Sequence, residues 1–216
     1  NHGHDLNLTV VRSSRNRCQG WLYNTQSFTI IGKLKMEKYV LYYMEDLLLK
    51  IKDFADRAHG DQMRKYTPER YIVHPERVML ICREYVTDIP VQAAALLHDV
   101  LEDTPVTSAE IEQFLTELMP QAQAQKTVKL VEELTDVYIK KDFPHLNRKS
   151  RKEMETTRLS KTSAAAQTIK SADLIDNAFD ILKDDPHLGR KFISEARSLL
   201  KHMKNGNAEL RQRAIK

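Results

Sequence analysis

Apolar residues recur at three- and four-residue steps through almost every segment of this chain after Met36. One such stripe runs from Leu41 through Leu48 and Ile51 to Ala58. This spacing places the apolar side chains on one face of a helix of about 22 residues. The chain has only 6 Gly and 7 Pro among 216 residues, too few for the many tight turns of an all-β fold. The pattern therefore predicts an all-α protein.

The same spacing predicts about eight helices in all, with no convincing strand and no internal repeat. Thr107 or Ser108 is a suitable N-cap for one of them. The helix that begins at Pro90 is apolar around most of its circumference, so we expect it to be central and buried. After the first helix, the predicted helices lie near residues 75–86, 90–103, 108–118, 121–137, 150–161, 164–182 and 188–203, the last of the chain.

Residues 1–35 differ from the rest of the chain. They contain the only Trp and a single acidic residue, and they have no sustained helical period. We interpret them as an irregular appendage that is either left over from an expression vector or upstream of a true start at Met36, with a mitochondrial presequence as the alternative. Residues 36–216 are then expected to form one domain.

Charge, cysteine content and hydropathy narrow the class of protein. The net charge of +4 is too small to indicate nucleic-acid binding by itself. Cys18 and Cys82 lack the spacing of a disulfide framework or a zinc knuckle, which favours a cytoplasmic protein. No apolar run reaches the roughly 20 residues of a membrane span, so we expect no membrane association. No oligomeric state is predicted.

The pair His98-Asp99 follows five small or apolar residues, Ala93–Leu97. Burying a charge without a partner is costly, and a metal ion would compensate Asp99 while accepting a neutral imidazole nitrogen from His98. One helical turn later come Glu102 and Asp103, each four residues after a member of the pair. Candidate ligands and candidate proton-transfer carboxylates therefore lie one turn apart.

Two further residues extend this set. His74 precedes Pro75 at a predicted helix start, and Asp173 follows an apolar stretch on a distant helix. With His98 and Asp99 they form a mixed nitrogen and oxygen donor set, which suits octahedral Mn²⁺ or Fe²⁺ better than structural zinc. Four protein ligands would leave about two positions for water and substrate.

Five stretches of the chain occur together in a known order: Arg64-Lys65, residues 71–75, 94–104, 131–136 and 169–177. In this order the chain resembles the HD phosphohydrolase superfamily. More narrowly, it resembles the hydrolase domain of the RelA/SpoT stringent-response enzymes and the stand-alone small alarmone hydrolases. The resemblance covers roughly residues 40–200 and implies a single HD-type helical domain.

The resemblance also implies an activity. Family members usually use Mn²⁺, and a water activated by the metal removes the 3′-pyrophosphate of ppGpp or pppGpp to leave GDP or GTP. Carried over by position, the implied metal ligands are His74, His98, Asp99 and Asp173. The implied catalytic residues are Glu102 and Asp103, and the implied nucleotide contacts are Arg64, Lys65 and Asn177.

The stretch after Asp173 departs from the family pattern. Many relatives have a basic residue and an apolar-basic pair there, whereas this chain reads Leu174-Ile175-Asp176-Asn177-Ala178-Phe179-Asp180. Asp180 stands where relatives often have Thr near the nucleoside. The alternatives are another substrate, such as NADPH or a pyrophosphorylated RNA end, or a non-catalytic nucleotide-binding regulator. The basic segment 140–161 is interpreted as a solvated face; the alternatives are that it lines the mouth of the site and attracts a polyphosphate, or that it binds RNA.

Overall fold

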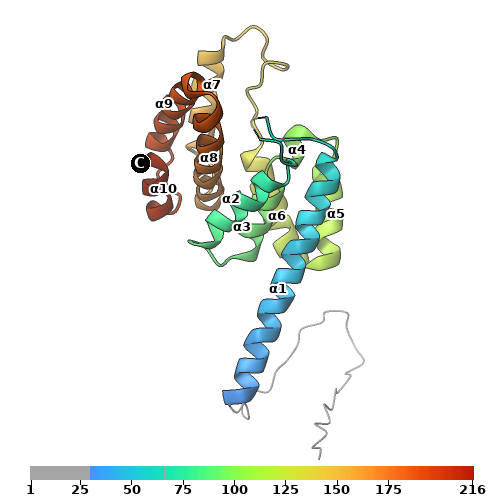
Figure 1. Ribbon diagram of the computed structural model, residues 1–216. Coiled ribbons are helices and arrows are strands. Elements are labelled where there is room, and N and C mark those ends of the chain that lie inside the picture. Colours follow the sequence, from blue (N-terminus) through green and yellow to red (C-terminus); the bar gives the residue numbers. More distant parts are fainter. Residues whose placement is uncertain (1–29, 66) are drawn as a thin grey trace, which may run out of the picture. The chain divides into compact units, whose positions relative to one another are not determined.

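The computed structural model describes residues 30–65 and 67–216, and within these ranges the regular elements are helices (Figure 1). Outside the helices, the described residues contain one isolated antiparallel bridge, between Met63 and Arg70. The predicted all-α class is therefore confirmed. The helices are α1 (Ile30–His59), α2 (Val73–Arg83), α3 (Ile89–Leu97), α4 (Val100–Asp103), α5 (Ser108–Leu118), α6 (Gln121–Leu134), α7 (Arg148–Leu159), α8 (Ala164–Asp184), α9 (Pro186–His202) and α10 (Ala208–Ile215).

The chain divides into two compact units, residues 1–39 and 40–216. Most of the predicted appendage lies outside the described residues, so the interpretation of residues 1–35 stays a prediction. Helix α1 begins at Ile30, before the start expected at Met36. All the features described below belong to the second unit. No helix of the described ranges combines the length and the apolar character that crossing a membrane requires.

The core of the second unit is built around α3, whose residues from Pro90 to Leu97 are all buried. This confirms the expectation of a central helix, which follows from its apolar residues on every face. Helices α2, α6 and α8 pack against α3, and α5 packs against α6. Helix α1 contributes Ile51 and Ala55 to the same core, and the ring of Phe54 stacks on that of Phe114 from α5 at 4.3 Å between centroids.

The structure differs from the predicted helices in two places. The helix expected to continue from Pro90 through Asp103 is interrupted at His98 and Asp99, so that α4 is a separate single turn. The prediction that the chain's last helix ends near Met203 is also wrong, because α10 follows. That helix is short and has one buried residue, Leu210, so its apolar period is weak; Asn207 caps it by accepting a hydrogen bond from the amide of Leu210.

The cap of α5 provides a test of how the sequence sets helix ends. Thr107 accepts a hydrogen bond from the amide of Glu110, whose carboxylate in turn accepts one from the amide of Thr107. We expect Thr107→Ala to lower the free energy of unfolding by about 1 kcal/mol because the amide of Glu110 loses its acceptor. Thr116→Ala, at an exposed position on the same helix, should change it by less than about 0.5 kcal/mol. Urea denaturation measures both, and equal losses would contradict this role for the cap.

Candidate metal centre

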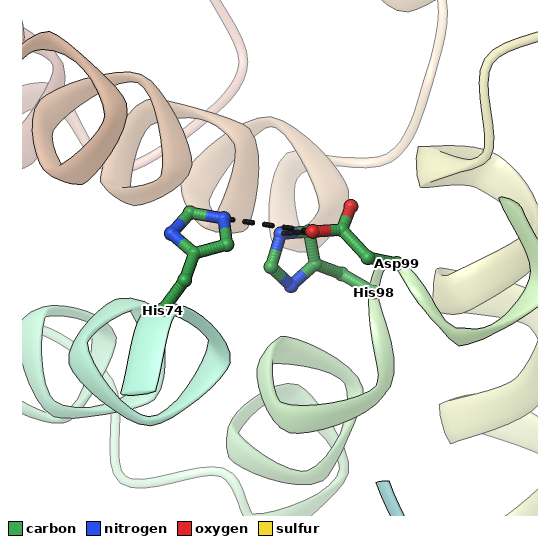
Figure 2. Close-up of side chains that lie close together, drawn as sticks. All are labelled: His74, His98 and Asp99. Atoms are coloured by element: carbon green, nitrogen blue, oxygen red, sulfur yellow. Dashed lines mark ion pairs between the residues drawn. The ribbon is translucent and has the colours of Figure 1, made fainter. Parts of the chain in front are cut away.

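Three side chains from two helix ends meet in the interior of the protein. His74 lies in the first turn of α2, whereas His98 and Asp99 follow the last residue of α3 (Figure 2). Each offers a donor atom, and these three atoms lie within 4.8 Å of one another. His74 Nε2 is 3.5 Å from Asp99 Oδ2, and His98 Nε2 is 3.2 Å from the same oxygen. The helix interruption thus turns the His-Asp pair toward His74.

The other ring nitrogen of each histidine has a partner that fixes its orientation. His98 Nδ1 lies 2.8 Å from the carbonyl oxygen of Ala95, and His74 Nδ1 lies 2.7 Å from Asp176 Oδ2. A carbonyl and a carboxylate only accept hydrogen bonds, so each Nδ1 must carry the proton and donate. Once Nε2 has given up its proton, each imidazole directs the lone pair of Nε2 toward the carboxylates, as a metal ligand requires.

Asp173 joins this group from α8. Its Oδ1 lies 3.2 Å from His74 Nε2 and 3.7 Å from His98 Nε2. The same oxygen accepts a hydrogen bond from the side-chain amide of Asn177. Its other oxygen is 2.8 Å from the ammonium group of Lys170, one turn earlier on the helix. Burial by itself would raise the pKa of Asp173, but Lys170 and the two histidines hold it well below the usual value.

Two aspects of the cluster indicate a site for a cation. His98 Nε2 is buried and has no hydrogen-bond partner among the described residues, although Asp99 is close. Burial would lower the pKa of His74, but hydrogen bonds to Asp173 and Asp176 raise it to about 9. Protons on the imidazoles therefore balance the carboxylates when no ion is bound. A divalent ion ligated by nitrogen and oxygen would supply that positive charge instead, so the donor set fits one.

Tyr71 supports Asp99 from the segment before α2. Its hydroxyl donates a 2.6 Å hydrogen bond to Asp99 Oδ2. Burial and the nearby carboxylates raise the pKa of Tyr71, so the phenol keeps its proton and remains a donor. Burial would raise the pKa of Asp99, but the two histidines and this hydroxyl lower it, so Asp99 is a carboxylate.

The two candidate proton-transfer residues lie on α4, beside the cluster. Glu102 remains accessible to solvent, yet surrounding protein atoms and the carboxylate of Asp136 raise its pKa to about 7, although it accepts a hydrogen bond from the amide of Asp136. Asp103 accepts a hydrogen bond from the side-chain amide of Gln62. Glu102 therefore exchanges a proton readily near neutral pH, which is what a general base needs.

The predicted nucleotide contacts have different surroundings. Arg64 is buried at its side chain and donates to Asp180 at 2.9 Å and to Asn177 at 3.3 Å. Lys65 is exposed on the same loop. Asn177 bridges Arg64 and Asp173, so it links the loop to the metal cluster. The role of these three residues in nucleotide binding stays a prediction.

A cavity of about 1160 Å³ opens beside the cluster between α7, α8 and α9. Asp173, Asn177 and Lys170 are among the residues that line it. Its wall carries both signs of charge: Arg148, Lys149, Lys152 and Lys191 alternate with acids such as Glu195, which pairs with Arg148 at 2.9 Å. Part of the basic segment thus faces a cavity and not only bulk solvent.

Sequence reasoning did not assign Lys170 or Asp176 to the site, and it left Tyr71 open as a base-stacking or core aromatic. The sequence does contain a pattern that could have identified Lys170 and Asp176. One long helix carries polar residues at three- and four-residue steps, which form a single polar stripe. These residues are Lys170, Asp173, Asp176, Asn177 and Asp180. A polar stripe that faces the core is unusual and indicates a site there. No comparable pattern in the sequence predicts the contact of Tyr71 with Asp99.

Comparison with known proteins agrees with this geometry. A family model described as an HD domain matches residues 52–200. The chain therefore belongs to the HD-domain family, and the resemblance described above is confirmed. This family implies a divalent metal ion, and the cluster of His74, His98 and Asp99 offers donor atoms that can hold one.

Within this family the chain is homologous to small ppGpp hydrolases. It is 35% identical over 174 residues to the human guanosine-3′,5′-bis(diphosphate) 3′-pyrophosphohydrolase MESH1, covering 76% of this chain and 89% of that protein. It is 41% identical over 75 residues to Escherichia coli SpoT, a bifunctional (p)ppGpp synthase/hydrolase, covering 33% of this chain and 10% of SpoT. A solved structure of a metazoan SpoT orthologue that hydrolyses ppGpp superposes with a TM-score of 0.64 at 26% identity, covering 78% of this chain and 91% of that one.

The pKa of His74 predicts how metal binding depends on pH. Below pH 9 the metal-free imidazole is protonated, so a divalent ion must displace a proton to bind. We expect the affinity to fall by about tenfold for each pH unit below 9 per proton displaced, and to level off above it. Calorimetric titrations in buffers of different ionisation enthalpy count the protons released. Binding without proton release at pH 7 would contradict this assignment.

Proposed function

We propose that this protein is a Mn²⁺-dependent hydrolase that removes the 3′-pyrophosphate of ppGpp or pppGpp and leaves GDP or GTP. The observation that carries the proposal is a buried metal-ligand cluster whose neighbour Asp173 also lines a cavity of about 1160 Å³. The homology to MESH1 along most of both chains supports the substrate. Mn²⁺ is favoured over zinc because the donors mix imidazole nitrogen with carboxylate oxygen.

Each residue of the site then has a specific task. His74, His98, Asp99 and Asp173 hold the ion, which supplies Lewis acidity toward water and the phosphate oxygens. Glu102 accepts the proton of the attacking water, and Asp103, held by Gln62, orients it. Lys170 neutralises the oxygen of Asp173 that faces away from the histidines, which leaves the other oxygen for the ion.

Residues outside the metal centre bind the parts of the substrate that do not contact the ion. Lys65 on the loop and Asn177 on α8 contact the nucleotide, and the cations of the cavity wall bind its phosphates. Arg64 contributes from the same side, although its guanidinium also forms an ion pair with Asp180. The phosphates of the substrate replace part of the pairing between these cations and acids such as Glu195.

Hydrolysis of ppGpp with added Mn²⁺ tests the function directly. We expect release of pyrophosphate and formation of GDP, and we expect Asp99→Ala to lose at least about 10³-fold in kcat because the ion is no longer held. Asp142→Ala, an exposed carboxylate outside the site, is the matched control and should keep full activity. Release of phosphate from NADPH with no turnover of ppGpp would overturn the proposed substrate while leaving the metal site intact.

The pKa of Glu102 predicts the pH profile. As a base Glu102 must be ionised, so kcat should rise about tenfold per pH unit below pH 7 and level off above it. Glu102→Gln should lower kcat by about 10²–10⁴-fold and remove this rise. Glu117→Gln, exposed on α5, should alter neither. If Glu102→Gln keeps full activity with metal bound, Glu102 is not the base.

A further inference from the structure

The imidazole of His74 has two distinct sides. Figure 2 shows one ring nitrogen facing Asp99 and the other turned away from the cluster. The nitrogen that is turned away, Nδ1, lies 2.7 Å from Asp176 Oδ2, and both side chains are almost completely buried. No other contact of Asp176 with the described residues is as short. Asp176 thus lies directly behind a metal ligand.

The alternative is that Asp176 serves only as an ion-pair partner for the nearby arginines. The distances argue against this. The guanidinium of Arg64 is 3.7 Å from Asp176 but only 2.9 Å from Asp180, with which it makes two hydrogen bonds. Arg77 is 3.9 Å from Asp176 and 2.7 Å from Glu69. Each arginine therefore has a closer carboxylate, and the close partner of Asp176 is His74.

We propose that Asp176 is a positioning residue for the metal, which fixes the ring of His74 and keeps its proton on Nδ1 so that Nε2 is free to bind the ion. A histidine ligand whose second nitrogen donates to a carboxylate binds metal more tightly, since the carboxylate orients the ring and increases its basicity. Arg64 and Arg77 lie farther from Asp176, at 3.7 and 3.9 Å. The inference rests on the metal site of the proposed function and not on its substrate.

Asp176 stands three residues after the ligand Asp173, so the two lie on the same face of α8. One helix therefore provides both a ligand and the residue that orients another ligand. The proposal also connects the loop that carries Arg64 to the ion through two contacts, Arg64 to Asp176 and Asp176 to His74.

Mn²⁺ binding to the whole protein, measured by calorimetry without nucleotide, tests the proposal. We expect Asp176→Ala to weaken Mn²⁺ binding by about 10–100-fold. Asp176→Asn keeps the shape and an acceptor oxygen but loses the charge, so its affinity should fall between those of the wild type and Asp176→Ala. Asp176→Asn also preserves the test if Asp176→Ala does not fold. Asp180→Asn is the matched control, because Asp180 contacts both arginines but not His74, and it should bind Mn²⁺ as the wild type does.

A spectroscopic measurement separates positioning from a general structural role. With Zn²⁺ as a diamagnetic probe, the wild type should show two slowly exchanging Nδ1–H resonances, from His74 and His98. Asp176→Ala should lose the first and keep the second, whose acceptor is the carbonyl of Ala95. Unchanged Mn²⁺ affinity in Asp176→Ala, or an equal loss in Asp180→Asn, would overturn the proposal. These outcomes do not depend on whether ppGpp is hydrolysed, so failure of the proposed substrate is distinguishable.

Discussion

The interruption of the central helix at His98 and Asp99 determines the chemistry of this protein. Helix α3 is buried from Pro90 to Leu97, so the residues that follow it emerge inside the molecule and not at its surface. An imidazole and a carboxylate at that point need partners, because charge without compensation is costly in a protein interior. His74 from α2 and Asp173 from α8 supply them. The buried pair therefore requires that α2 and α8 pack near the end of α3, and the same packing brings the residues of the site together.

The acids of the site outnumber its buried cations, and each of these cations pairs with a carboxylate oxygen outside the region between the two imidazoles. Lys170 contacts the oxygen of Asp173 that faces away from the histidines, and Arg64 holds Asp180 on the opposite side of Asn177. The carboxylate of Asp173 therefore stays ionised, while the region between the two imidazoles has no fixed protein cation among its described neighbours. That region is where an exogenous divalent ion gains most from electrostatic attraction.

Much of this arrangement could be predicted from the sequence. The apolar period predicted the helices and the burial of α3, and the family resemblance identified the residues that meet at the cluster. The interruption at His98 was not predictable from helical period, because residues 98–103 continue the same spacing. The surroundings of Arg64 were equally hidden, since its partners Asn177 and Asp180 are more than 110 residues away and long-range pairing leaves no local pattern. Helix α10 was missed because a short helix with one buried residue has little period to detect.

The carbonyl of Ala95 links secondary structure to the metal site. The last four carbonyls of a helix have no amide partner within it, and in α3 the imidazole of His98 takes up one of them. The same acceptor thus completes the end of the helix and orients a ligand. Fraying of the last turn of α3 would release His98 from its orientation, and a bound ion would in return oppose that fraying. Amide hydrogen exchange at the end of α3 would then slow when the metal is loaded, so a measurement on the backbone reports on the state of the site.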